Sequence, residues 1–218
     1  MARHTFEVQV DSLHRKLLSM GALVEEAIHK AMKSLVDRNA GLAEEVISHD
    51  QVINQLEQEI ETGCMQVIAL QQPVGSDLRR LGTMLKLVTD LERMGDHAVA
   101  IAKTTRRLMS EPYPKPLIDL PEMANHVKAM VRDSLNAYVA KDQQLAEEVA
   151  IRDDIVDKLY AKIFSDLINL MSKQQSVISQ GTHLLLVAQY LERIADHVTN
   201  ICERIIYLDT GKLTDLNK

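Results

Sequence analysis

An internal repeat constrains the fold of this chain more than any other feature of its sequence. Leu91–His97 reads LERMGDH, and residues 191–197, one hundred positions later, read LERIADH. Between residues 81–108 and 181–208 eight aligned positions are identical, where chance would give about two. The chain is therefore expected to contain one structural unit twice.

Each unit is expected to be helical. Only eight glycines and five prolines occur in 218 residues, and apolar side chains recur at steps of three and four. With 46% apolar residues the chain can bury a sizeable core. The pattern predicts three helices in each half, over residues 6–38, 42–70 and 78–109 and over residues 122–140, 144–171 and 178–208.

The residues between the two halves are predicted to form a linker. Four of the five prolines lie within residues 112–121, and proline is excluded from helix interiors. The middle helices also align, Leu42–Val46 with Leu145–Val149, at an offset of 103. The sequence thus predicts an all-α fold of two tandem repeats of an antiparallel three-helix bundle, with the first repeat at residues 1–110, the linker at 111–121 and the second repeat at 122–218.

Composition narrows the class of function. The net charge of -6 argues against nucleic acid as the main partner, because phosphate neutralisation requires an excess of Lys and Arg. Cys64 and Cys202 form no CxxC motif and are expected to be buried thiols in a reducing compartment. No apolar run reaches the length of a membrane span, and the N-terminus lacks a signal-peptide core, so we expect a soluble cytosolic protein.

Each copy of the repeated motif carries two carboxylates, Glu92 and Asp96 in the first and Glu192 and Asp196 in the second. On a helix this spacing separates them by about 40° in rotation and roughly 6 Å along the axis. A helical wheel places both at the border of the buried face. Two carboxylates so arranged can hold a cation.

The histidine that ends each copy, His97 or His197, lies on a different side of the wheel. It falls at about 240° from the leucine that begins the motif, whereas the two carboxylates fall at about 100° and 140°. The histidines are therefore predicted to be solvated or interface side chains and not metal ligands.

The middle helix of each half contributes a further carboxylate. Asp50 and Asp153 occupy aligned positions where a core leucine would be expected, and each has a polar residue four positions later, Asn54 or Asp157. A carboxylate that faces a bundle interior costs several kcal/mol unless it is paired or bound to a metal. The repetition predicts two oxygen-rich metal sites, which suit Mg, Ca or Mn, and iron or zinc when carboxylates bridge several ions.

Two alternatives remain open at this point. The carboxylates are exposed pairs or helix–helix salt bridges in a purely structural reading, since Glu-x-x-x-Asp spacing is common. In the other reading the chain is a carboxylate-bridged helical metalloenzyme, a hydrolase or an oxidase. Di-iron oxidases use Glu-x-x-His on two helices, and here that spacing occurs once, at Glu26 and His29, without a counterpart in the second half. The sequence has no Gly-rich phosphate loop, zinc-protease motif or nucleophile elbow.

The motifs together resemble those of the PhoU family of bacterial phosphate-signalling regulators. The resemblance rests on Gln72-Pro73 before Ser76-Asp77-Leu78-Arg79 and on the doubled Glu-Arg-x-x-Asp, and it covers almost the whole chain. The family pattern often has Glu-Arg-Ile-Gly-Asp in both copies, whereas this chain has Met94 in the first and Ala195 in the second. Asn54, aligned with Asp157, leaves the first predicted site one carboxylate poorer.

The resemblance implies a non-enzymatic negative regulator of phosphate uptake and of the phosphate-starvation response. Proteins similar to this one act at the cytoplasmic face, between the ATPase subunit of a Pst-type phosphate ABC transporter and a sensor histidine kinase. It also implies a homodimer that binds metal ions in multinuclear iron or zinc clusters. The implied ligands are Glu92, Asp96, Asp50 and Asn54 in the first repeat and Glu192, Asp196, Asp153 and Asp157 in the second.

Overall fold

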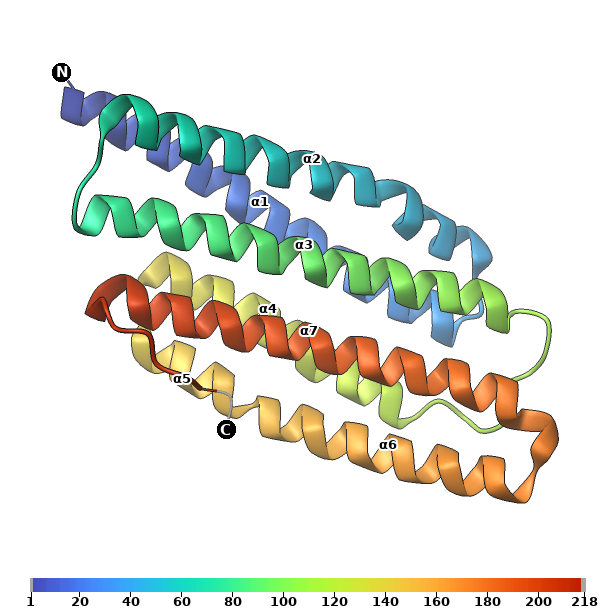
Figure 1. The fold of residues 1–218 in the computed structure, drawn as a ribbon. Helices are drawn as coiled ribbons and strands as arrows, with labels where there is room; N and C mark the ends of the chain where they lie inside the picture. Colours follow the sequence, from blue (N-terminus) through green and yellow to red (C-terminus); the bar gives the residue numbers. More distant parts are fainter. Residues whose placement is uncertain (1, 217–218) are drawn as a thin grey trace.

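The structure is a computed structural model that describes residues 2–216, with side chains described from residue 4 onward. Over this range the chain forms seven α-helices, one short 3-10 helix and no strand (Figure 1). The elements are α1 (Ala2–Val36), α2 (Ala40–Gln71), α3 (Ser76–Leu108), α4 (Asp119–Ala140), α5 (Gln143–Ile151), α6 (Asp153–Lys173), η1 (Gln175–Val177) and α7 (Ile178–Thr210).

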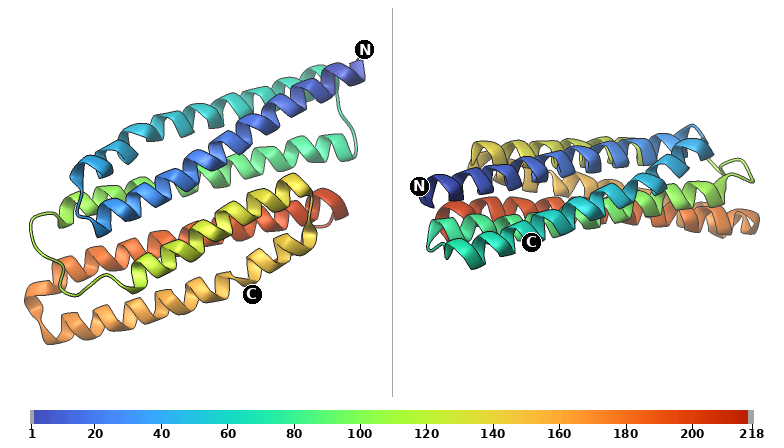
Figure 2. Two further views of the ribbon diagram at one scale, coloured as in Figure 1. Left: turned by 180° about the vertical axis from the view of Figure 1, so that it is seen from behind. Right: turned by 90° about the horizontal axis from the view of Figure 1, so that it is seen from above.

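The helices form two bundles that lie side by side. α1, α2 and α3 pack against one another, and α4, α5 and α6 pack against α7. The bundles meet through α3 with α7 and α1 with α4, so α2, α5 and α6 lie on the outside of the molecule (Figures 1 and 2). The all-α prediction of two tandem three-helix units is confirmed. Among the described residues no helix is long and apolar enough to cross a membrane.

The same turn chemistry joins the first two helices of each repeat. The Oδ1 atoms of Asn39 and Asp142 accept hydrogen bonds from the backbone N–H of Leu42 and Leu145, both at 3.0 Å, and cap α2 and α5. The residue before each cap is left-handed, with φ of 53° at Arg38. Its counterpart Lys141 has φ of 54°. The backbone therefore confirms the register of 103 residues between these segments.

The middle helix of the second repeat differs from the prediction. One helix was expected over residues 144–171, but the chain breaks at Arg152 into α5 and α6, whereas α2 is continuous. The backbone N–H of Arg152 donates a hydrogen bond to the carbonyl oxygen of Val149 at 3.0 Å. Its guanidinium donates to Asp133 Oδ2 of α4 at 2.6 Å, which holds the break against the neighbouring helix.

α4 begins at Asp119, three residues before the expected start at Glu122 and inside the segment predicted as linker. Pro121 lies in the first turn of α4, where a backbone N–H has no helical partner to lose, so the proline does not prevent the helix from starting earlier. The connection between the repeats is therefore residues 109–118, which we call the linker.

The core is aliphatic and continuous through both bundles. Met20, Met84 and Met94 are among its fully buried side chains, so methionine fills space that aromatic residues occupy in other proteins. Cys64 and Cys202 are buried free thiols, as predicted, and burial raises the pKa of both to about 12. At neutral pH both therefore stay protonated, as inert core residues.

Candidate metal sites

The repeated motif lies on α3 and α7, the two helices that meet at the centre of the molecule. Leu91 and Leu191, which begin the two copies, are fully buried. Glu92 and Glu192, one position later, are half-buried, at the edge of the interface with the middle helix. The border position predicted from the helical wheel is therefore confirmed for both copies.

In the first repeat the middle helix brings Asp50 and Asn54 to the carboxylates of α3. The Asn54 amide Nδ2 donates to Asp50 Oδ2 at 3.2 Å. Asp50 Oδ1 and Asn54 Oδ1 are buried and have no hydrogen-bond partner among the described residues. Burial, and then the charge of Asp96, raise the pKa of Asp50. Two buried acceptor oxygens without a donor are atoms that a cation would satisfy.

A cation from the protein already reaches two of these carboxylates. The Arg93 guanidinium lies 3.0 Å from Asp96 Oδ2 and 3.5 Å from Glu92 Oε2. It is more than half exposed, so this pairing contributes little stability. The pKa of Glu92 is still raised, first by burial and then by the charge of Asp96. Arg93 therefore does not fully neutralise the first cluster.

The second cluster is more crowded. Asp153, Asp157, Glu192 and Asp196 all line one open pocket of about 590 Å³, as Asp154 does. Burial and the charges of its neighbours, Asp157 first, raise the pKa of Asp153 to about 7. Burial and neighbouring carboxylates also raise the pKa of Glu192 and of Asp196. Like charges are thus held together in a partly desolvated place, as expected where a cation binds.

The oxygen-only donor sets fit hard cations, and also iron or zinc where carboxylates bridge ions. Among the described residues, no three His, Cys, Asp or Glu side chains converge on a point that could hold one metal ion. The clusters are therefore not closed sites as they stand, and the carboxylates would have to turn toward one another to coordinate a cation.

The first cluster has a cavity of mixed apolar and polar lining beside it. Asp50 lines a space of about 150 Å³ together with Val46, Ile53 and Gly95. A Cβ on Gly95 would lie 3.3 Å from Ile53 Cδ1 and 3.9 Å from Asp50 Oδ1. Position 195, the counterpart of Gly95, is alanine. The second repeat therefore carries a Cβ at a position where the first has none.

A family model described as the PhoU domain matches this chain over residues 17–105 and 120–205. The chain belongs to the PhoU family. A phosphate-specific transport system accessory protein PhoU homolog of Clostridium acetobutylicum is 46% identical over 218 residues, all of this chain and all of that protein.

Two PhoU crystal structures share the fold. The phosphate transport system regulatory protein PhoU of Streptococcus pneumoniae superposes with a TM-score of 0.90 at 36% identity, covering 96% of this chain and 99% of that one. PhoU of Pseudomonas aeruginosa superposes with a TM-score of 0.92 at 35% identity, covering 95% of this chain and 100% of that one.

Sequence reasoning missed one carboxylate in each PhoU repeat. Burial and the charge of Glu92 raise the pKa of Glu57, which lies on the stripe of α2 that also carries Asp50. Glu57 thus supplies a further carboxylate to the first cluster, which has Asn54 where the second cluster has Asp157. Its stripe position was visible in the sequence, but its counterpart is Tyr160, so the repeat alignment hid it. In the second repeat, Asp154 follows Asp153 and lines the same pocket.

The histidines of the two PhoU motifs lie where α3 meets α7. The ring centroids of His97 and His197 are 5.8 Å apart. The ring of His97 also stacks on Tyr190 at 5.8 Å, and His197 Nδ1 donates to Asp90 Oδ1 at 2.9 Å. Of the two predicted alternatives, a solvated or an interface side chain, the interface is correct for both histidines.

Proposed function

We propose that this protein is a non-enzymatic negative regulator of phosphate uptake and of the phosphate-starvation response. Family membership supports the link to phosphate, because the relatives are named as accessory or regulatory proteins of phosphate transport. The observation that carries the proposal for this chain is the pair of matched carboxylate clusters on long packed helices. Among residues 4–216 no hydrogen-bonded pair of nucleophile and base lies beside the clusters, and this supports a binding role over a catalytic one.

The second part of the proposal is that the clusters bind metal ions. Glu92, Asp96, Asp50 and Asn54 would hold ions in the first repeat, with Glu57 as a further oxygen donor. The second set would be Glu192, Asp196, Asp153 and Asp157. A bound cation supplies positive charge that relieves carboxylate repulsion and fixes the middle helix against the third. The PhoU resemblance favours multinuclear iron or zinc clusters.

The third part concerns partners. We propose that the protein works as a homodimer at the cytoplasmic face, in contact with the ATPase subunit of a phosphate ABC transporter and with a sensor histidine kinase. A rigid helical body with ion-dependent geometry is suited to such a role, because an ion that moves one helix changes the surface offered to a partner.

Deletion of the gene tests the regulatory proposal. In phosphate-rich medium the deletion strain should express phosphate-responsive genes that the parent strain represses. Re-expression of the native chain should restore repression. Unchanged repression in the deletion strain would contradict the proposal.

Variants of the clusters then test whether metal binding serves regulation. Asp153→Asn combined with Glu192→Gln should restore repression only in part. Glu122→Gln, at an exposed position of α4 outside both clusters, should restore it fully. Metal quantification of protein purified without chelator should show less bound metal in the double variant than in the control.

An enzyme assay separates the proposal from the metalloenzyme alternative. Metal-loaded protein should neither hydrolyse phosphoesters nor consume oxygen. Turnover that disappears in Glu92→Ala and Glu192→Ala would contradict the non-enzymatic proposal.

A further inference from the structure

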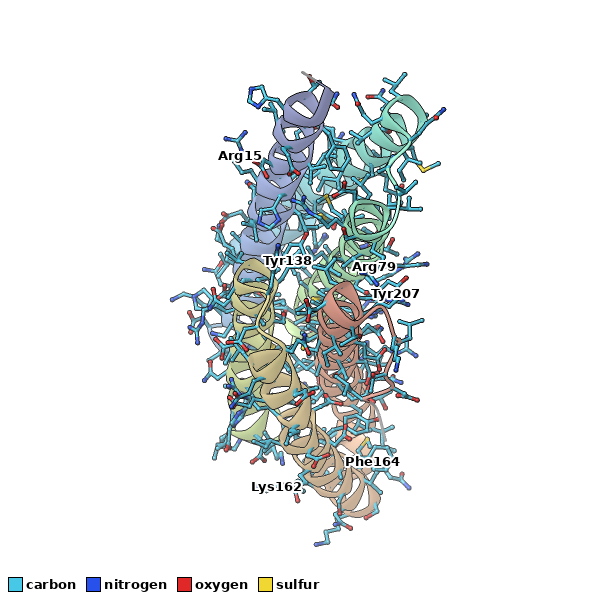
Figure 3. The ribbon with its side chains drawn as sticks, turned by 90° about the vertical axis from the view of Figure 1, so that its left-hand side faces the viewer. Arg15, Arg79, Tyr138, Lys162, Phe164 and Tyr207 are labelled. Carbon is cyan, nitrogen blue, oxygen red and sulfur yellow. The ribbon has the colours of Figure 1, made fainter. Side chains whose placement is uncertain are left out.

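A small polar cavity lies at one end of the interface between the repeats, far along the helices from the carboxylate clusters. It has a volume of about 160 Å³ and is enclosed by α1, α3, the end of α4 and the end of α7. Figure 3 shows this end of the molecule, with Tyr138 between the neighbouring helices. The space holds about five water molecules at ~30 Å³ each, which matches a small ion and is too small for a nucleotide.

The cavity gathers groups that donate hydrogen bonds. Lys141 and Arg80 line it, and the side-chain ammonium of Lys141 has no ion pair or hydrogen bond with any described residue. Arg80 uses one guanidinium nitrogen on Glu7 Oε2, at 3.1 Å, and carries further N–H groups. The side chain of Tyr138 is 94% buried, and its hydroxyl bonds to none of the described residues. Burial raises the pKa of Tyr138 to about 12, so its hydroxyl remains a donor.

The equivalent position at the other end of the interface between the repeats is occupied by a residue of the chain itself. The counterparts of Lys141 and Arg80 are Arg38 and Gln180. Both contact Glu111: Arg38 donates to its carbonyl oxygen at 2.7 Å, and Gln180 Nε2 donates to its carboxylate Oε2 at 3.0 Å. Glu111 therefore provides an acceptor for both donors, its carboxylate for Gln180 and its backbone carbonyl for Arg38.

The cavity has no carboxylate at the position equivalent to Glu111. The counterpart of Glu111, one hundred residues later, is Gly211, which has no side chain. Both donor positions thus keep a donor in the cavity, with Arg80 in place of Gln180 and Lys141 in place of Arg38. The carboxylate of Glu111 has no counterpart, because the equivalent residue is Gly211. A guanidinium and an ammonium that line one mostly enclosed space form a site for an anion from solution.

The remaining polar residue of the cavity selects among anions. Asp11 lines the cavity, and its carboxylate has no described hydrogen-bond partner. A carboxylate repels sulfate and phosphate monoester dianions, which carry no proton at neutral pH. Hydrogenphosphate keeps one O–H and can donate it to Asp11 while its other oxygens accept from the cations.

We propose that this cavity binds inorganic hydrogenphosphate, with Lys141, Arg80 and Tyr138 as donors and Asp11 as acceptor of the phosphate proton. The inference goes beyond the regulatory proposal and rests on the cavity residues alone. A phosphate ion there would link α1 of the first repeat to α4 of the second.

His14 provides a built-in reporter. Its ring lies 5.1 Å from that of Tyr138, and it lines the same cavity. Burial, and then the charges of Arg80 and Lys141, lower the pKa of His14, while Asp11 raises it. A bound dianion would offset the two cations, so the titration midpoint of His14 should move upward when phosphate binds.

The test is calorimetric titration of the metal-free full-length protein with sodium phosphate, sodium sulfate and a phosphate monoester at pH 7.5 and matched ionic strength. Removing metal keeps the carboxylate clusters from binding phosphate through an ion. Proton NMR of the histidine rings, assigned with His14→Gln, follows the midpoint of His14 in the same samples.

We expect phosphate to bind at least tenfold more tightly than sulfate or the monoester. Lys141→Gln should weaken phosphate binding about tenfold, as expected for a lost charge-assisted hydrogen bond. Tyr138→Phe, which removes only the hydroxyl, should weaken it several-fold, and Asp11→Asn should remove the preference over sulfate. Glutamine already adopts the left-handed conformation at Gln72, so the lysine variant keeps the turn. Lys86→Gln, an equal loss of charge on an exposed face of α3, is the control.

Three results would overturn the inference. The first is the absence of phosphate binding with an unmoved His14 midpoint. The second is equal affinity for phosphate and sulfate in the native chain. The third is equal phosphate affinity in Lys141→Gln and Lys86→Gln. Each leaves the regulatory proposal standing, since that proposal is tested by deletion of the gene and by the enzyme assay, neither of which depends on phosphate binding to this cavity.

Discussion

His97 and His197 face one another across the interface of the two repeats, with ring centroids 5.8 Å apart. Each ring is also contacted from the opposite repeat by a residue at an equivalent position, Tyr190 beside His97 and Asp90 beside His197. An approximate twofold axis therefore passes between the two imidazoles. The two contacts come from equivalent sequence positions but differ in chemistry, because one histidine has an aromatic neighbour and the other a carboxylate.

That asymmetry predicts unequal effects of substitution at the two equivalent positions. Asp90 Oδ1 accepts from His197 Nδ1 at 2.9 Å and from Asn200 Nδ2 at 3.4 Å. Asp90→Ala should lower the free energy of unfolding by about 1–2 kcal/mol, since it leaves partly buried donors without an acceptor. Tyr190→Phe should change it by less than about 0.5 kcal/mol, because the ring stacking is kept. Denaturant unfolding of both variants measures this, and equal effects would contradict the asymmetry.

Removal of metal should destabilise the protein if the carboxylate clusters bind cations. Without a cation, several partly buried carboxylates repel one another, so adding a chelator to metal-loaded protein should lower Tm by several degrees. Asp153→Asn and Asp50→Asn should each reduce that shift, and Glu122→Gln should leave it unchanged. A thermal scan with and without chelator is the measurement, and indifference of the metal-loaded native chain to chelator would count against the sites.

The stability of the metal-free protein should depend on pH through Asp153. Its pKa rises from 3.8 to about 7 on folding, so between these values the folded state binds more protons than the unfolded state. The contribution of this group to stability is therefore present below pH 4 and is lost as the pH rises toward 7. Because the group is about half exposed, we expect a loss on the order of 1 kcal/mol.

A histidine works in the opposite direction over part of this range. Burial, and then the charge of His197, lower the pKa of His97 from 6.5 to about 4, so stability is lost as the pH falls from 6.5 to 4. The measurement is therefore the difference in unfolding free energy between native protein and Asp153→Asn, at several pH values. The variant should gain relative to the native chain as the pH rises from 4 to 8, and a flat difference would refute the assignment.

Arg38 should hold the linker without contributing much to overall stability. Its guanidinium donates to the carbonyls of Met109 and Glu111, both at 2.7 Å, and lies 5.1 Å from the centroid of the Tyr113 ring. Arg38→Gly keeps the left-handed turn and removes these contacts. A protease of broad specificity should then cleave residues 109–118 faster, while the free energy of unfolding changes by less than about 1 kcal/mol.

The matched control is Lys141→Gly, the same change at the equivalent turn of the second repeat. Lys141 makes no described contact with the linker, so cleavage there should be as slow as in the native chain. Equal protection of the linker in Arg38→Gly and in the native chain would show that the arginine does not anchor it.

Much of the fold followed from the sequence, because helical periodicity and repetition report directly on buried faces. The positions of Glu92 and Glu192 at the border of those faces could be read from a helical wheel. The break at Arg152 could not, because residues 144–171 contain no glycine or proline, and Asp153 occupies the same stripe position as Asp50 of the continuous helix α2. It depends on a tertiary contact, the bond from Arg152 to Asp133 of another helix.

The cavity at the end of the interface was equally hidden. Its donors, Arg80 and Lys141, come from different repeats and become neighbours only when the two bundles pack. The repeat alignment pairs Glu111 with Gly211. The importance of this difference became clear only from the structure, in which Arg38 and Gln180 both donate hydrogen bonds to Glu111. Sequence reasoning finds residues that share a helix face more readily than residues that share a helix end.

The break between α5 and α6 gives the two carboxylate clusters different mechanical settings. In the first repeat Asp50 lies within α2, an uninterrupted helix of 32 residues. A cation that pulled on Asp50 would therefore act on one continuous helix. In the second, Asp153 is the first residue of α6, directly after the break. A cation that drew Asp153 toward Glu192 would bend the chain at this joint and swing α6. The same kind of ion would therefore hold α2 in place in the first repeat and change the direction of α6 in the second.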